Sequence, residues 1–123
     1  MNIKKVLIAE DEAQNRLLLT RIVGRNGFET SCVENGQEVI EKLESETFNL
    51  LLLDISMPIL DGIETTLRIR KLKNDNANIP IILISGNNAE YLANTCREIG
   101  ATDFIVKPYD LQMITNILKK YNS

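Results

Sequence analysis

The sequence contains no histidine and no tryptophan, and only two of its 123 residues are cysteine. Without histidine, the chain cannot form a Ser-His-Asp or Cys-His nucleophile, an imidazole zinc site or a phosphohistidine. Cys32 and Cys96 are far apart and lack CxxC spacing, so we expect both to be reduced thiols in the core. Any chemistry of this chain must therefore use carboxylates, hydroxyls, lysine or a hard metal ion.

Long apolar runs and an excess of basic residues are also missing. No segment approaches the ~20 apolar residues of a membrane span, and the apolar stretch near the N-terminus is too short for a signal peptide. The 14 Lys and Arg residues against 17 Asp and Glu residues give a net charge of −3, which argues against a nucleic-acid-binding surface. These absences predict a cytoplasmic protein that contacts neither membranes nor nucleic acids directly.

Short aliphatic runs alternate with stretches of helical periodicity five times along the chain. Continuous apolar runs are typical of strands buried on both faces, as in a parallel sheet covered by helices. The expected strands are residues 3–9, 29–34, 49–55, 80–85 and 103–106. The pattern predicts a single domain over residues 1–123 with a doubly wound α/β fold, a five-stranded parallel sheet in (βα)₅ order.

The segments between the expected strands carry apolar residues at helical spacing, which indicates the sides that face the sheet. These residues are Ala13, Leu17, Leu18 and Ile22; Val39, Ile40 and Leu43; Ile63 and Leu67; Ala89, Leu92, Ala93, Cys96 and Ile99; and Leu111, Ile114, Leu118 and Tyr121. We expect Gly27 to end the first helix and Asn35 to cap the second.

Polar residues follow the ends of four expected strands. Ligands of open parallel sheets bind beyond the carboxyl ends of the strands, so these side chains should meet at one edge. The residues are Glu10, Asp11, Asp54, Ser85 and Lys107. Each acid alone could simply cap a helix, but clustered carboxylates repel one another unless a cation is present. Carboxylate ligands favour Mg²⁺, with Mn²⁺ as a possible substitute, over zinc.

A magnesium site beside a hydroxyl and an ammonium group suits a phosphoryl group. The Ser85 hydroxyl can donate to one phosphoryl oxygen, and the Lys107 ammonium can neutralise another. Because histidine is absent, a carboxylate is the best candidate nucleophile. Asp54 directly follows a run of four leucines, where we expect its position to be most rigid.

Four segments resemble the receiver domains of two-component response regulators, the CheY-like family. They are residues 6–12, 52–62, 84–86 and 100–108. The motif Asp-x-x-Met-Pro-x-x-Asp-Gly at 54–62 is highly specific in combination with Lys107-Pro108. The resemblance covers essentially the whole chain and implies the strand order 2-1-3-4-5. It also implies a phosphoacceptor domain that assists its own Mg²⁺-dependent phosphorylation and dephosphorylation, rather than a conventional enzyme.

The resemblance implies a role for each residue of the expected site. Asp54 would accept a phosphoryl group from a phosphohistidine on a sensor histidine kinase or a histidine phosphotransfer protein. Asp11, Asp54 and the backbone carbonyl of Ser56 would bind Mg²⁺, and Glu10 would reach the ion through water. The Glu10-Asp11 pair departs from the commoner Asp-Asp pair and gives the first acid a longer reach.

Three further residues would carry the signal in such a domain. Ser85 would be the hydroxyl switch, and Lys107 would contact the phosphoryl group next to a cis Lys107-Pro108 bond. Phe104 would be the aromatic switch, turning inward on phosphorylation, although core packing alone explains an aromatic in a final strand equally well. The surface of the fourth helix, fifth strand and fifth helix would then change shape and bias the binding of a downstream partner that the sequence does not identify.

Three alternatives use similar features. A degenerate receiver would act as an interaction module that is never phosphorylated. A dehalogenase-type phosphatase needs Asp-x-Asp, and Asp54-Ile55-Ser56 lacks the second acid. A flavodoxin-type FMN module has a Ser/Thr/Gly-rich phosphate loop after its first strand, whereas residues 10–12 are all acidic here.

Overall fold

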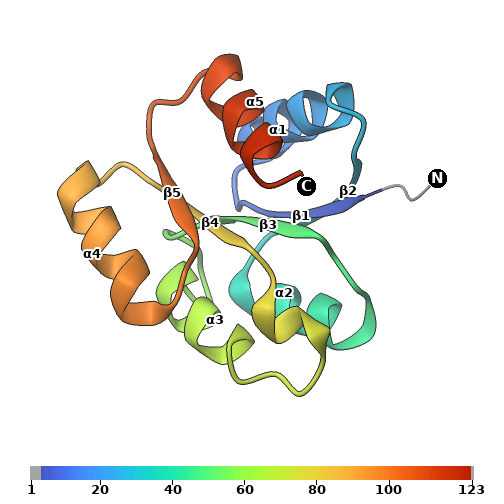
Figure 1. The fold of residues 1–123 in the computed structure, drawn as a ribbon, viewed down its shortest axis with the longest axis vertical. Coiled ribbons are helices and arrows are strands. Elements are labelled where there is room, and N and C mark those ends of the chain that lie inside the picture. Colours follow the sequence, from blue (N-terminus) through green and yellow to red (C-terminus); the bar gives the residue numbers. More distant parts are fainter. Residues whose placement is uncertain (1–3, 123) are drawn as a thin grey trace.

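A five-stranded parallel sheet with the order β2-β1-β3-β4-β5 forms the middle layer of the computed structural model (Figure 1), which describes residues 4–122. The strands are β1 Lys5–Ala9, β2 Glu29–Val33, β3 Leu50–Asp54, β4 Ile81–Ser85 and β5 Asp103–Val106. The predicted doubly wound fold and the strand order 2-1-3-4-5 are both confirmed. The prediction starts the first strand at Ile3, which lies outside the described residues.

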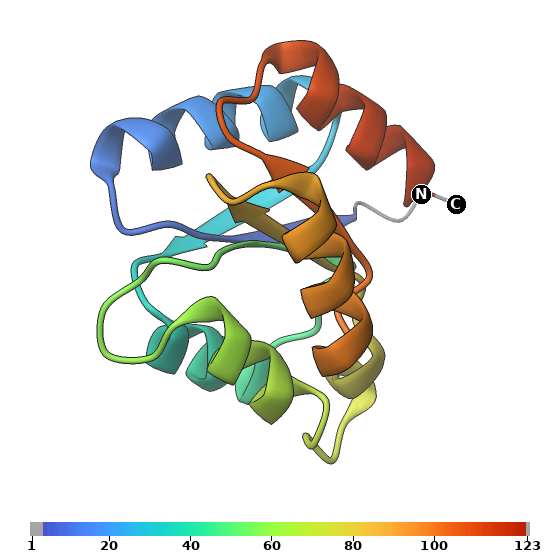
Figure 2. The ribbon, with the colours of Figure 1, turned by 90° about the vertical axis from the view of Figure 1, so that its left-hand side faces the viewer.

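In the described part of the chain, five α-helices cover the two faces of the sheet. They are α1 Ala13–Arg25, α2 Gly36–Ser45, α3 Gly62–Ile69, α4 Ala89–Ile99 and α5 Leu111–Lys120. Helices α1 and α5 lie on one face, and α2, α3 and α4 lie on the other (Figure 2). A short 3₁₀ helix, η1 Asp75–Asn78, precedes β4 and is not predicted from the sequence.

The central strand β3 shows why continuous apolar runs are needed here. Successive side chains of a strand point to opposite faces, and both faces of this sheet are covered. Leu50 and Leu52 pack with the α1 and α5 side, whereas Leu51 and Leu53 pack with the α2 to α4 side. Every residue of β3 is buried, including the terminal Asp54. The strand therefore delivers a carboxylate to the sheet edge from a fully packed support.

The predicted buried side of α1 is confirmed for Ile22 and wrong for Ala13, Leu17 and Leu18, which are exposed. Leu17 and Leu18 are 52% and 47% exposed, and the residues of α1 that face the sheet are Leu19, Ile22 and Val23. Leu67 of α3, Ala89 of α4 and Leu111 of α5 are also exposed, against expectation. The buried residues of α3 are Gly62, Thr65, Thr66 and Ile69. The two threonines can be buried because each hydroxyl donates to a backbone carbonyl one turn earlier.

The two cysteines are free, but only one of them lies in the core. Cys96 of α4 is buried, as predicted, whereas Cys32 of β2 is exposed and corrects the prediction. The reason is that β2 is an edge strand in which only Val33 is buried. The predicted ends of two helices are confirmed, since Gly27 has φ 89° just after α1 and the Asn35 side chain accepts the Glu38 amide at the start of α2.

Among residues 4–122, none of the helices combines the length and apolar character that a membrane crossing requires.

Candidate functional site

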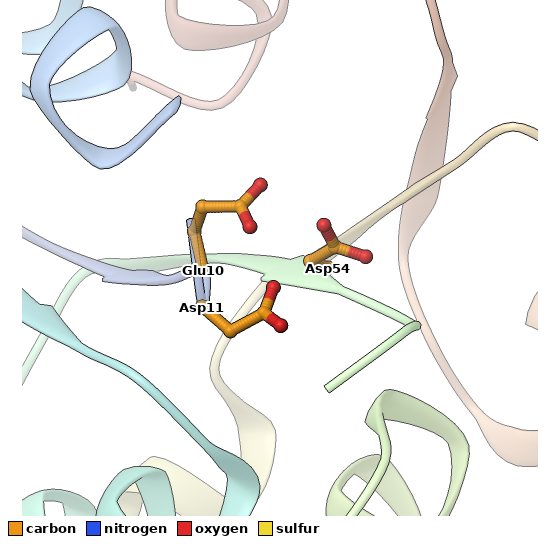
Figure 3. A group of neighbouring side chains, drawn as sticks. All are labelled: Glu10, Asp11 and Asp54. Carbon is orange, nitrogen blue, oxygen red and sulfur yellow. The ribbon is translucent and has the colours of Figure 1, made fainter. Parts of the chain in front are cut away.

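Three carboxylates meet beyond the carboxyl ends of β1 and β3 (Figure 3). One oxygen from each of Glu10, Asp11 and Asp54 lies within 4.8 Å of the other two. The parallel register pairs Ala9 with Leu53, so the residues that follow them emerge side by side. Glu10 is 1% exposed and Asp54 is 2% exposed, whereas Asp11 is exposed. The cluster therefore has a buried base and one side open to solvent.

Backbone amides in the two loops orient the buried acids. Asp54 Oδ1 accepts the Ser56 amide at 2.8 Å, and Glu10 Oε2 accepts the Glu12 amide at 3.0 Å. Gly62 packs closely against the backbone at the end of β3. A Cβ at this position would lie 2.7 Å from Ile55 Cα and 2.8 Å from the Asp54 carbonyl oxygen. Only glycine fits there without a shift of the backbone that carries Asp54.

Lys107, the residue after β5, completes the cluster. Its Nζ lies 2.7 Å from Asp54 Oδ2 and 3.9 Å from Glu10 Oε1. Its backbone amide donates to the Ser85 carbonyl at 2.7 Å, and the Lys107-Pro108 peptide is cis, as expected. We call Glu10, Asp11, Asp54 and Lys107 the acidic pocket.

Charge is unbalanced in the acidic pocket. Three carboxylates face one ammonium group. Burial raises the pKa of Glu10 from 4.5 to about 7, a rise to which Asp54 adds and which the Glu12 amide partly opposes. Burial lowers the pKa of Lys107, but Asp54 and then Glu10 outweigh it and hold the lysine charged. An all-carboxylate donor set with excess negative charge fits a hard divalent cation such as Mg²⁺.

The remaining predicted residues are Ser85, Ser56 and Phe104, and they differ in burial and in their relation to the pocket. Ser85 is buried at the end of β4, where its Oγ accepts the Asn87 amide at 3.1 Å. Ser56 is exposed and joins the pocket through its amide. Phe104 is half-buried and packs against the core on the α2 to α4 side of the sheet. The structure thus brings together Glu10, Asp11, Asp54 and Lys107, and places Phe104 apart from them.

Sequence reasoning missed two residues beside the pocket. Arg16 Nη1 donates to the backbone carbonyls of Glu10 at 2.9 Å and Asp11 at 3.0 Å, which ties α1 to the loop after β1. Tyr109, two residues after Lys107, has a buried hydroxyl. Arg16 lies in the first turn of α1, directly after the loop that carries Glu10 and Asp11, so the expected first helix could have suggested this contact. Nothing in the sequence pattern indicates the environment of the Tyr109 hydroxyl.

Comparison with known proteins gives a family match over most of the chain. The model of the response regulator receiver domain matches residues 6–119. The chain is 33% identical over 113 residues to the CAI-1 autoinducer sensor kinase/phosphatase CqsS of Vibrio cholerae, covering 92% of this chain and 16% of that protein. It is 30% identical over 118 residues to sporulation initiation phosphotransferase F of Bacillus subtilis, covering 96% and 93%.

The fold also matches a solved receiver domain. The receiver domain of the sensor histidine kinase PA1611 from Pseudomonas aeruginosa, with a magnesium ion coordinated in its active-site cleft, superimposes with a TM-score of 0.88. It is 24% identical to this chain, and the match covers 99% of this chain and 100% of that one. The chain spans less than a fifth of several sensor kinases that it resembles and nearly all of the small phosphotransferase. It belongs to the response regulator receiver domain family of two-component and phosphorelay systems.

Proposed function

We propose that residues 1–123 act as a single receiver domain that accepts a phosphoryl group on Asp54. The observation that carries the proposal is the contact of Lys107 Nζ with Asp54 Oδ2 at 2.7 Å, inside a pocket that holds two further carboxylates. An ammonium group at this place can neutralise charge on an incoming phosphoryl group. The proposed donor is a phosphohistidine on a sensor histidine kinase or a histidine phosphotransfer protein, in keeping with the family match. No residue of this sequence can be that phosphohistidine, since it contains no histidine.

The transfer exchanges one bond at phosphorus for another. An oxygen of Asp54 forms a bond to phosphorus while the phosphorus–nitrogen bond of the donor breaks. The electron pair of that bond stays on the imidazole nitrogen, and the aspartate becomes an acyl phosphate. Burial between packed strands and the hydrogen bond from the Ser56 amide hold the Asp54 carboxylate in one orientation.

The acidic pocket fits Mg²⁺, and Mn²⁺ is a plausible substitute by donor chemistry. Asp11 and Asp54 would hold the ion with the backbone carbonyl of Ser56, and Glu10 would reach it through water. When bound, the ion offsets negative charge on the phosphoryl oxygens. Among the described residues, Lys107 is the cation that forms ion pairs with these carboxylates, and one positive charge against three negative charges supports the assignment.

We further propose that phosphorylation is read out on the face formed by α4, β5 and α5. The modification adds roughly −1 to −2 of charge to the site. The Ser85 hydroxyl would turn from the Asn87 amide toward a phosphoryl oxygen, and Phe104 would turn inward. The half-buried ring of Phe104 is consistent with such a movement, since it packs against the core without being enclosed by it.

The decisive experiment is the intact mass of the protein after incubation with acetyl phosphate, with Mg²⁺ and with EDTA. We expect one phosphoryl adduct that requires Mg²⁺ and is lost in Asp54→Asn. Asp75→Asn is the matched control, because it makes the same chemical change at an exposed aspartate of η1. A degenerate receiver would gain no adduct under any condition, and an adduct that persists in Asp54→Asn would refute the assignment of the acceptor.

A further inference from the structure

The hydroxyl of Tyr109 is buried and has no hydrogen-bond partner within residues 4–122. Tyr109 lies in the loop between β5 and α5, and its ring packs against the apolar cluster between the sheet and helices α1 and α5. A buried hydroxyl without a partner destabilises a folded protein by roughly 1–3 kcal/mol. A phenylalanine would keep the ring packing and avoid this penalty, so the hydroxyl needs an explanation.

The charges that act on this hydroxyl belong to the acidic pocket and the loop beside it. Burial raises the pKa of Tyr109, and the carboxylates of Glu10, Asp54 and Glu12 raise it further, while Lys107 opposes them. Tyr109 also lines a cavity together with Lys107, whose Nζ lies 2.7 Å from Asp54 Oδ2 and 3.9 Å from Glu10 Oε1. The buried hydroxyl therefore belongs to a residue that adjoins the acidic pocket on the α1 and α5 side of the sheet.

Of the two buried carboxylates of the pocket, Asp54 uses both oxygens as acceptors, from the Ser56 amide and from Lys107 Nζ, so Glu10 is the one with an oxygen available to such a donor. Its Oε2 accepts the Glu12 amide at 3.0 Å, whereas its Oε1 lies 3.9 Å from Lys107 Nζ, beyond hydrogen-bond distance. A phenol can donate to this oxygen without adding positive charge. This matters in a pocket that binds a cation, because a second ammonium group would repel the ion.

We propose that Tyr109 is a positioning residue of the acidic pocket. Its hydroxyl donates to Glu10 Oε1, directly or through one water molecule, when a divalent cation occupies the pocket. The hydrogen bond fixes the long Glu10 side chain at the place from which it supports the ion. This inference rests on the proposed magnesium site, and it adds a residue from the β5–α5 loop to that site.

The test is the affinity for Mg²⁺, measured by isothermal titration calorimetry on the unphosphorylated protein. Tyr109→Phe removes one oxygen atom, and we expect it to weaken Mg²⁺ binding about three- to tenfold, the loss of one hydrogen bond. The control is Tyr91→Phe, which removes the same atom from an exposed tyrosine of α4 and should leave the affinity unchanged. Urea unfolding in EDTA should show Tyr109→Phe as stable as the wild type or more so.

A spectroscopic measurement separates positioning from packing. With ¹³C-labelled tyrosine, the ring resonances of Tyr109 should shift on addition of Mg²⁺, and those of Tyr91 should not. Equal Mg²⁺ affinity for Tyr109→Phe and Tyr91→Phe would overturn the role of Tyr109 while leaving the proposed phosphoacceptor function intact. A wild-type protein that binds no Mg²⁺ would overturn both. A weakened affinity matched by an equal loss of stability in EDTA would show that the hydroxyl acts through packing alone.

Discussion

Asp54 and Asp103 lie at opposite strand ends of the same sheet, and they differ in how many hydrogen-bond donors and positive charges surround them. Asp103 begins β5 and accepts three donors: the Phe104 amide at 2.8 Å, the Tyr121 hydroxyl at 2.8 Å and Lys120 Nζ at 3.1 Å. Asp54 ends β3, and within residues 4–122 it pairs with Lys107, which lies 3.9 Å from Glu10 as well. We call Asp103, Lys120 and Tyr121 the Asp103 cluster. Asp103 accepts hydrogen bonds from three donors, whereas Asp54 belongs to a group of three carboxylates that share one lysine.

The difference is reflected in the pKa values. Burial raises the pKa of Asp103, but Tyr121, the Phe104 amide and Lys120 outweigh it, so the net pKa is lowered and the charged form is stabilised. Burial raises the pKa of Glu10 to about 7, so its charged form is disfavoured. The Asp103 cluster therefore stabilises the fold, and the acidic pocket holds negative charge at a cost that a bound cation can offset.

The largest expected contrast is between the two lysines. Lys107→Met should slow the formation of the phosphoryl adduct from acetyl phosphate about 100-fold, the usual effect of removing one group that stabilises developing charge. Lys120→Met makes the same change at the other aspartate, where Lys120 contacts Asp103 at 3.1 Å, and should leave the rate within about twofold. Initial rates by intact mass at saturating Mg²⁺ measure both. Equal slowing in the two variants would show that Lys107 acts only by supporting the fold.

The titrations of Glu10 and Asp103 should change the free energy of unfolding with pH in opposite directions. Glu10 has a higher pKa folded than unfolded, so its contribution is fully present below pH 4.5 and is lost as the pH rises to about 7. In EDTA this loss should approach about 3 kcal/mol of the free energy of unfolding. Asp103 has a lowered folded pKa, so its contribution is present above its ordinary pKa of 3.8 and is lost as the pH falls further.

Urea unfolding of the wild type and Glu10→Gln between pH 4 and 8 tests whether the ionisation of Glu10 lowers the free energy of unfolding. The neutral variant should lose less stability than the wild type across this range, because glutamine has no proton to release. The two profiles would be parallel if Glu10 titrated normally in the folded protein. Asp103→Asn serves as the control, since its effect on the slope should be confined to acid below about pH 4.

Magnesium should stabilise the protein through the acidic pocket and not through the Asp103 cluster. At a concentration ten times its dissociation constant, Mg²⁺ should stabilise the protein at pH 7.5 by about 1.4 kcal/mol, by mass action on the folded state alone. Asp103→Asn should keep the whole increment, and Asp11→Asn should lose most of it, because only Asp11 lies in the acidic pocket. Thermal unfolding with Mg²⁺ or with EDTA measures the increment. A full increment in Asp11→Asn would exclude Asp11 from the metal site.

The acidic pocket could be predicted from sequence because it depends on strand ends alone. Once β1 and β3 are neighbours in a parallel sheet, the residues that follow them must lie together, whatever the side chains nearby. The buried side of α1 depends on finer detail. Three consecutive leucines, residues 17–19, fit a helix in more than one phase, and only packing against the sheet selects Leu19. The exposure of Cys32 likewise follows from the edge position of β2, which no local pattern reveals.

The Asp103 cluster marks the limit of such prediction, and it provides the smallest expected effect. Tyr121 lies 18 residues after Asp103, and their contact depends on how α5 returns along the sheet. Tyr121→Phe removes one hydrogen bond to a charged group and should lower the free energy of unfolding by about 1 kcal/mol, equally with Mg²⁺ and with EDTA. Tyr91→Phe, at an exposed ring, should change neither value. If Tyr121→Phe lowered the free energy of unfolding only with Mg²⁺, the acidic pocket and the Asp103 cluster would be energetically coupled, and the Asp103 cluster would take part in the response to the ion.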